Sequence, residues 1–157
     1  MRTYAPRGET PLLKVFETRD HLSVISGITT RGKLATWQRG YALKSADSIA
    51  FLRHLYAYPG RKLLVIWDGA TIHRSREVRE FLAQGWAEHI HLERFPAYAP
   101  ELNPDERVWQ HLKHVELRNI CCQDLTQLGT ELDLAIRRIR NRSELIQSFF
   151  AGAELDL

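Results

Sequence analysis

One segment constrains the fold of this 157-residue chain more than any other: residues 62–68, KLLVIWD. It is a continuous apolar run that ends in an acid. A run of this kind is typical of a strand that is covered on both faces, as in sheets with parallel strands. The segment therefore predicts an α/β domain in which helices cover the sheet.

The segments around this run follow strand and helix patterns. The expected strands lie at 12–18, 21–30, 33–41, 62–68 and 90–95, and the expected helices at 45–58, 75–84, 104–117 and 124–150. A hairpin followed by alternating helices and strands indicates a mixed sheet with flanking helices. We expect one domain over residues 1–157, with a helical C-terminal region at about 122–157.

Composition excludes several classes of protein. Hydrophobic residues make up 44% of the chain and charged residues 26%, as in a globular protein rather than a disordered tail. No apolar run approaches the length of a membrane span, and the start of the chain has no hydrophobic signal segment, so we expect a cytoplasmic protein without a membrane partner. The adjacent Cys121 and Cys122 fit neither a disulfide framework nor a CxxC metal site. The net charge of +3 is compatible with a polyanionic partner but does not require one.

Asp68, the acid at the end of the apolar run, has two interpretations. Active sites of α/β sheets gather where strands end, and Gly69 allows a tight turn directly after this one. Alternatively, Asp68 caps that turn by bonding its own backbone. The strand pattern alone favours neither interpretation. His73 is a further candidate in the following loop, although a lone loop histidine is more often a surface residue.

Glu106 lies at the start of the helix that is expected from Pro104. Asn103 is a good N-cap, and Pro104 suits the first helical turn. A capping box would use the carboxylate of Glu106, three residues after that cap. Helical spacing suggests another role, because Glu106 does not share the expected apolar face of the helix. That face consists of Val108, Leu112 and Val115. The Glu106 carboxylate could therefore face a cleft.

Two other polar clusters allow weaker hypotheses. His111 and His114 share a helix face and could suggest zinc, but no third ligand stands at a suitable spacing, which favours a solvated face. The last helical region carries four arginines: Arg137, Arg138, Arg140 and Arg142. They are candidate DNA contacts, and phosphate contacts there would be sensitive to salt. A solvated helix face is the commoner account of such a cluster.

Three segments, taken in order, resemble those of a known family. Residues 67–73, WDGATIH, resemble its second-aspartate strand with the small residues and histidine that follow. Residues 96–109, PAYAPELNPDERVW, resemble its proline-rich loop and glutamate-bearing helix, and residues 2–8, RTYAPRG, resemble the segment after its first catalytic strand. The family is that of the mariner-type transposases of bacterial insertion sequences, within the DDE transposase and retroviral integrase superfamily. The resemblance implies an RNase H-like fold.

The resemblance also implies a chemistry, which is DNA transposition by two-metal phosphodiester cleavage and strand transfer with Mg²⁺ or Mn²⁺. Hard cations prefer oxygen ligands, so this chemistry uses converging carboxylates. Carried over residue by residue, Asp68 is the second catalytic metal ligand and Glu106 the third, with His73 and Asn103 as candidate auxiliary residues. The implied partners are the DNA of the element ends and target, and a homodimer or a separately encoded N-terminal transposase part. The implied location is the bacterial nucleoid.

The sequence departs from the family pattern at its start. In the family, the first catalytic aspartate lies upstream of the segment that residues 2–8 match, on the central strand of the sheet, after a helix-turn-helix region. The chain begins at that segment, so we expect the central strand to be missing and the chain alone to be inactive. The nearest acids, Glu17 and Asp20, match no family position.

Two other functions stay open. A non-catalytic DNA-binding or regulatory remnant of a transposase would use the basic surface without cleaving DNA. An unrelated α/β metal-dependent hydrolase would use Asp68 and His73, but the order of the proline-rich loop and the glutamate-bearing helix argues against it. We choose transposase ancestry and keep the remnant as the alternative for present activity.

Overall fold

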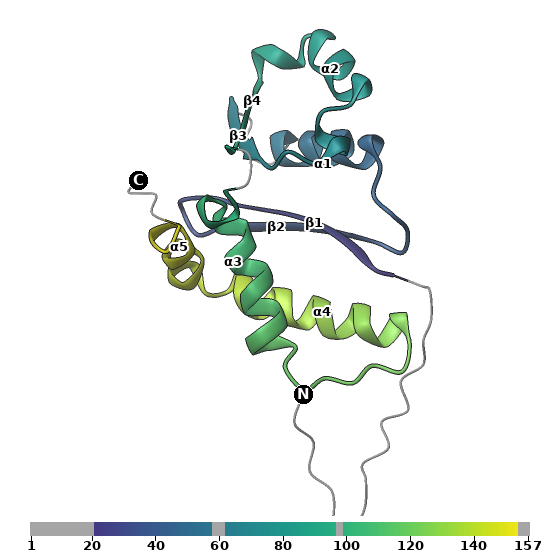
Figure 1. Cartoon of the computed structure of the whole chain (residues 1–157), viewed down its shortest axis with the longest axis vertical. Helices are drawn as coiled ribbons and strands as arrows, with labels where there is room; N and C mark the ends of the chain where they lie inside the picture. Colours follow the sequence, from purple (N-terminus) through teal and green to yellow (C-terminus); the bar gives the residue numbers. More distant parts are fainter. Residues whose placement is uncertain (1–20, 58–61, 97–98, 154–157) are drawn as a thin grey trace, which may run out of the picture.

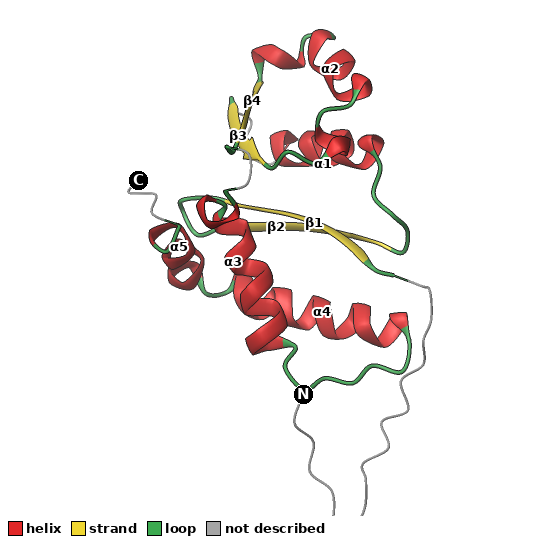
Figure 2. Ribbon diagram, in the orientation of Figure 1, coloured by secondary structure: helices red, strands yellow, loops and turns green. Residues whose placement is uncertain are grey.

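The structure is a computed structural model, and it describes residues 21–57, 62–96 and 99–153 (Figure 1). The predicted strand at 12–18 and the segment 2–8 lie outside the described residues. Within them the elements follow the expected order of hairpin, helix, strand, helix, strand and helices (Figure 2). No described helix has both the length and the apolarity needed to cross a membrane.

The N-terminal hairpin consists of β1 (Ser23–Ile28) and β2 (Leu34–Arg39), which pair antiparallel with Ser26 opposite Thr36. β-Branched residues and alternation explain these strands. The turn between them ends in Gly32, whose φ of 73° lies in the left-handed region that glycine adopts readily. The predicted hairpin is therefore confirmed, with shorter strands than expected.

A second, parallel pair follows, formed by β3 (Leu63–Trp67) and β4 (Ile90–Arg94). The connection between them contains α2 (Arg76–Ala83), which Ser75 caps by accepting a hydrogen bond from the Val78 amide. After α2, Gly85 adopts a φ of 97° and reverses the chain, as its position predicts. Parallel strands need such a helical crossover.

Helix α1 (Ser45–Ala57) lies between the two strand pairs in sequence and packs with both. It contacts α2, and its Leu52 joins Phe81 of α2 and Ile90 of β4 in one buried cluster. On its other side, Phe51 lies against Gly27 of β1 and the Trp37 ring of β2. The hairpin and the parallel pair are thus held together through α1.

The elements after β4 are all helical in the described residues, and the helices α3, α4 and α5 cover the opposite face of the hairpin (Figure 1). Helix α3 (Pro104–His111) continues directly into a π-helical turn (Leu112–Glu116), and α4 (Leu125–Arg140) and α5 (Ser143–Ala151) follow. The larger core cluster joins these helices to β2 and consists of Leu34, Val108, Leu112, Leu132, Ala135, Ile136, Ile139, Ile146 and Phe149. Burial of these apolar side chains is the main force that holds the hairpin to the helices.

Three details differ from the expected pattern. The region 124–150 is two helices rather than one, with a break at residues 141–142. Val115 is 58% exposed instead of lying on the apolar stripe, because the π-helical turn shifts the face on which it lies. In β3, Leu64 and Ile66 are 64% and 49% exposed, so the prediction that this strand is covered on both faces is wrong for the part of the chain that the structure describes.

The described strands form two separate two-stranded sheets, with β1 paired only to β2 and β3 paired only to β4. The inner face of β3 packs on the α1 and α2 side through Val65 and Trp67. Its outer face carries the exposed Leu64 and Ile66. Asp68 follows directly after β3, at the carboxyl end of both parallel strands.

Candidate active site

Asp68 is held in place by the loop that follows β3. Its Oδ1 atom accepts hydrogen bonds from the Ala70 amide and from Nδ1 of His73, each at 2.9 Å. His73 ends a short 3-10 turn, Thr71–His73, and its ring stacks on Trp67 with a centroid separation of 4.5 Å and an interplanar angle of 2°. The His73 side chain is 13% exposed, whereas that of Asp68 is 56% exposed.

This arrangement combines both interpretations of Asp68. One oxygen caps the turn, as the structural interpretation expects. The other oxygen, Oδ2, accepts no hydrogen bond from the described residues, and the side chain is open to solvent. The Nδ1 atom of His73 must carry the proton to donate to Asp68, so the loop fixes both the ring and the carboxylate. Asp68 therefore has a fixed orientation and one unused oxygen.

Glu106 is exposed in the first turn of α3, and the cap of this helix is made without it. The side chain of Asn103 accepts a hydrogen bond from the Asp105 amide at 3.1 Å, which is the predicted N-cap. A capping box would have Glu106 accept from the Asn103 amide. That amide instead donates to the carbonyl of Pro100 at 3.1 Å. The described residues give the Glu106 carboxylate no hydrogen bond and no ion pair, so it is available for another role.

Asp105, between Asn103 and Glu106, has a very different environment. Its Oδ2 atom accepts hydrogen bonds from Ser26 Oγ at 2.6 Å and from Trp109 Nε1 at 3.1 Å. Its Oδ1 atom is buried without a hydrogen-bond partner among the described residues. Burial raises the pKa of Asp105, the two hydrogen bonds oppose that shift, and the charges of Glu106 and Asp68 raise the pKa further.

The domain that carries Asp68, Asp105 and Glu106 matches a known protein family. The family profile described as DDE superfamily endonuclease matches residues 1–128. The chain belongs to this superfamily. The uncharacterized 39 kDa protein of insertion element IS630 from Shigella sonnei is 30% identical over 115 residues, which make up 72% of this chain and 31% of that protein. The predicted relation to DDE transposases of insertion elements is confirmed.

Solved structures confirm the predicted fold of this DDE-superfamily domain. The Mos1 mariner paired end complex with Mn matches it with a TM-score of 0.60 at 17% identity, over 98% of this chain and 50% of that one. The catalytic domain of Mos1 mariner transposase matches with a TM-score of 0.51 at 16% identity, over 85% of this chain and 80% of that one. The fold is RNase H-like. The chain spans about a third of the insertion-element protein and half of the Mos1 chain in that complex.

The four candidate DNA contacts of the last helical region do not share one role. They are Arg137, Arg138, Arg140 and Arg142. Arg138 Nε lies 2.6 Å from Glu116 Oε2, and Arg140 donates to the Leu34 carbonyl at 3.0 Å and to Thr36 Oγ1 at 2.7 Å. These two side chains tie α4 to neighbouring elements. Arg137 and Arg142 are exposed and make no side-chain hydrogen bond or ion pair with the described residues. They remain the candidate DNA contacts of the set.

His111 of α3 and His114 of its π-helical turn do not join Asp68 or Glu106 in a group of described residues that could hold a metal ion. His111 Nε2 is 3.5 Å from Oε1 of Glu116, and the same carboxylate pairs with Arg138. The His111 ring lies 5.9 Å from the ring of Phe149, while His114 is exposed. The described residues contain no group of three His, Cys, Asp or Glu side chains that could hold a metal ion.

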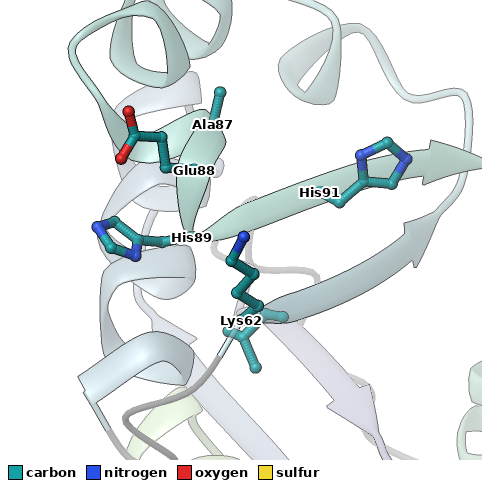
Figure 3. Close-up of a pocket in the computed structure, with 6 residues that line it drawn as sticks. Lys62, Ala87, Glu88, His89 and His91 are labelled. Atoms are coloured by element: carbon teal, nitrogen blue, oxygen red, sulfur yellow. The ribbon is translucent and has the colours of Figure 1, made fainter.

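A shallow pocket lies at the other end of the parallel strand pair, away from Asp68 (Figure 3). It has a volume of about 260 Å³ and is lined by Lys62, Leu63, Ala87, Glu88, His89 and His91. In Figure 3, Lys62 lies just before β3, Glu88 and His89 lie just before β4, and His91 lies further along β4. Tyr56 already bonds Nδ1 of His89 at 3.2 Å. The lining of this pocket includes neither Asp68 nor Asp105 nor Glu106.

Sequence reasoning selected Asp68, Glu106, His73 and Asn103 but assigned no role to Asp105. One signal was present, because Trp109 follows Asp105 by four residues, which places both on one side of a helix. The Ser26 contact could not be found in this way.

Proposed function

We propose that this DDE-superfamily domain is the catalytic domain of an insertion-sequence transposase, with Asp68 and Glu106 as two carboxylate ligands of the divalent cations that act on DNA phosphodiesters. One observation carries the proposal. Asp68 and Glu106 are exposed carboxylates, and Asp68 Oδ2 and both oxygens of Glu106 make no hydrogen bond with the described residues. Strand-end and helix-start acids of this kind also match the order of the family motifs.

The chemistry of the two side chains fits Mg²⁺ or Mn²⁺. Carboxylate oxygens are the ligands that hard cations prefer, and Asp68 Oδ2 and the Glu106 carboxylate are both accessible. When bound, a cation pair would stabilise the charge that develops on the attacking and leaving oxygens of a phosphodiester. The Mos1 complex with Mn, a structure of similar fold, supports this choice of cation.

The residues of the chain itself prepare this site. His73 and the Ala70 amide hold Asp68 by Oδ1, so that Oδ2 needs no reorientation before it binds a cation. Asn103 and Pro100 satisfy the start of α3, which leaves Glu106 unused by the cap. The resemblance assigns a third, bridging carboxylate to a strand upstream of residue 2. Without that carboxylate, we expect Asp68 and Glu106 to bind a cation more weakly than all three carboxylates together.

Binding of Mn²⁺, followed by electron paramagnetic resonance, tests the proposal. Asp68→Asn and Glu106→Gln should each weaken Mn²⁺ binding by about tenfold, because each removes a charged ligand. Glu101→Gln is the matched control, because Glu101 is an exposed acid in the turn that precedes Asn103. The Glu101→Gln variant should bind Mn²⁺ with the same affinity as the unmodified chain. Equal affinities for all four proteins would refute the proposed site.

We expect the chain alone neither to cleave nor to join terminal-repeat DNA in Mg²⁺ or Mn²⁺. Two-metal chemistry needs a carboxylate that holds both ions at a fixed separation, and the described residues contain no group of three His, Cys, Asp or Glu side chains that could hold a metal ion. The assay should therefore give no product above background. Robust cleavage that Asp68→Asn abolishes would show that another carboxylate of this chain completes the site.

The alternative function, a DNA-binding or regulatory remnant, is supported by a different observation. Arg137 and Arg142 are exposed near the C-terminal end of α4, where no described acid pairs with them. Phosphate contacts by such residues need no metal. DNA binding that is unchanged by Asp68→Asn and Glu106→Gln, with or without Mn²⁺, would favour the remnant over the catalytic domain.

A further inference from the structure

Consecutive side chains at the start of α3 contact different parts of the domain. Asp105 reaches β1 through Ser26, and Glu106 is exposed. Arg107 donates to the carbonyl of Gly152 at the end of α5. Since each residue advances about 100° around a helix, the direction of Asp105 also sets the direction of its neighbour Glu106.

The contact of Asp105 is a buried junction of two donors on one oxygen. Ser26 Oγ comes from the hairpin, 79 residues away in sequence, and donates at 2.6 Å. Trp109 Nε1 comes from the next turn of α3 and donates at 3.1 Å. The Asp105 Oδ1 atom beside them is buried without a partner among the described residues. Oδ2 thus links the helix to β1 and, at the same time, fixes the indole on the same side of the helix.

A buried carboxylate of this kind is not explained by stability. Burying a charged or polar group costs free energy that its hydrogen bonds only partly offset. The apolar contacts of α3 and the π-helical turn, made mainly by Val108 and Leu112, are non-directional and would tolerate small rotations of the helix. Hydrogen bonds to one oxygen tolerate far less. The junction therefore restricts the rotation and the axial position of α3 on the hairpin.

We propose that Asp105 is a positioning residue, which fixes the first turn of α3 to Ser26 of β1 and so places the Glu106 carboxylate opposite Asp68. This inference rests on the proposed function, in which Asp68 and Glu106 bind the same cations. It gives a role to an acid that is adjacent to the predicted ligand and is itself turned away from solvent.

Cysteine cross-linking tests the placement without any metal. In the full chain with Cys121→Ser and Cys122→Ser, the pair Asp68→Cys and Glu106→Cys should cross-link efficiently with a short bifunctional thiol reagent. Adding Asp105→Ala should lower the cross-linking rate by about fivefold, because the helix loses its polar anchor. Asp105→Asn should restore the rate, since the amide oxygen can accept from both Ser26 and Trp109.

A matched control separates this role from general packing. Asp133 of α4 also bonds the hairpin, through Gln38 of β2, but it lies on another helix than Glu106. Asp133→Ala should leave the cross-linking rate unchanged. If Asp105→Ala does not fold, Ser26→Ala and Trp109→Phe each remove one donor and should each slow cross-linking. A folded Asp105→Ala variant that cross-links at the parent rate overturns the inference, as does a parent pair that does not cross-link.

Mn²⁺ binding by the same Asp105 and Asp133 variants, with Asp68 and Glu106 intact, separates the two proposals. Efficient, Asp105-dependent cross-linking together with no Mn²⁺ binding would support the positioning role and refute the proposed metal site. Mn²⁺ binding that depends on Asp68 and Glu106, but cross-linking that is indifferent to Asp105, would refute the positioning role alone.

Discussion

His73 joins structure and function at the end of β3. Its ring stacks on Trp67, the last residue of the strand, and its Nδ1 atom holds one oxygen of Asp68. A stacked ring has little rotational freedom, so the hydrogen bond is made without a further entropic cost. The orientation of the candidate ligand therefore depends on a residue that need not touch the metal.

If His73 orients Asp68, its removal should weaken the binding of a divalent cation. His73→Ala should weaken Mn²⁺ binding by about tenfold, the lower end of what removal of an orienting partner costs. His91→Ala is the control, because His91 also pairs with an acid, Glu93, but on the exposed face of β4. Electron paramagnetic resonance measures both affinities. Equal losses for the two variants would mean that the effect is not specific to the site.

Asp105 gives a prediction about pH. Burial raises its pKa above the usual 3.8, so the folded chain holds this proton at pH values at which the unfolded chain has lost it. The ionised Asp105 therefore destabilises the fold, and its cost grows as the pH rises from 3.8 through the folded pKa. The free energy of unfolding of the Asp105→Asn variant should rise relative to that of the unmodified chain as the pH rises from 3.8 through the folded pKa. Below pH 3.8 the variant should have no such advantage. Denaturant unfolding at a series of pH values measures the difference, and a constant difference would contradict the assignment.

Gly32 gives a prediction about stability. Its φ of 73° is unfavourable for other residues, and a Cβ atom there would lie 2.5 Å from the carbonyl oxygen of Ser143. Gly32→Ala should therefore lower the free energy of unfolding by about 2 kcal/mol. Gly40→Ala is the control, because nothing lies within 4 Å of its added methyl group and its φ is not positive. A change as small as that of Gly40→Ala would show that the turn and α5 can move apart at little cost.

At the scale of single residues, local motifs predicted Asp68, Glu106 and Asn103 as site candidates. The N-cap role of Asn103 is confirmed, because it depends on neighbours within the same turn. The burial of Asp105 was not predictable in this way, because its partner Ser26 is distant in the sequence. A helical pattern shows which residues share a face but not what that face contacts.

At the scale of elements, periodicity predicted the hairpin, the crossover helix and α3, since each has a strong local pattern and clear end signals. It could not predict which face of β3 is covered. A continuous apolar run shows that a strand can be buried on both faces, but it does not show which other elements cover each face. The break between α4 and α5 also escaped prediction, because residues 141–142 contain neither proline nor glycine.

The arginines at the end of α4 and at the start of α5 give a prediction about DNA binding. Arg137→Ala with Arg142→Ala should weaken DNA binding and reduce its salt dependence, because both side chains are exposed and unused by the fold. Arg138→Ala with Arg140→Ala should instead lower stability by about 1–2 kcal/mol, because these side chains bond Glu116 and the hairpin. Binding isotherms at several salt concentrations and thermal unfolding distinguish the two pairs. Binding that is flat across salt would contradict an electrostatic origin.

At the scale of the whole molecule, the two strand pairs leave backbone amides and carbonyls at their outer edges without a described partner strand. β1 and β3 each pair with one described strand only, so each has a second edge whose amides and carbonyls lack a described partner strand. The exposed Leu64 and Ile66 lie on β3 as well. Such edges and apolar side chains favour association with a further strand. The resemblance places the strand that carries the first aspartate between the hairpin and β3.

The last prediction follows from that placement. A chain fused at its N-terminus to a family-like strand that ends in aspartate should pair this strand between β1 and β3. Its unfolding midpoint should rise by roughly 5 °C, and amides of both strands should exchange more slowly. The same fusion should cleave terminal-repeat DNA in Mg²⁺, because the added carboxylate stands at the bridging position that the resemblance assigns to the first aspartate.

Two controls separate the structural gain from the catalytic one. The fusion with asparagine in place of the added aspartate should keep the higher midpoint and lose cleavage. The active fusion with Asp68→Asn should also lose cleavage. If the fused strand neither slows amide hydrogen exchange in β1 and β3 nor raises the unfolding midpoint, then this strand does not pair with the edges of the two sheets. The proposed completion of the sheet would then be wrong, whatever the cleavage assay gives.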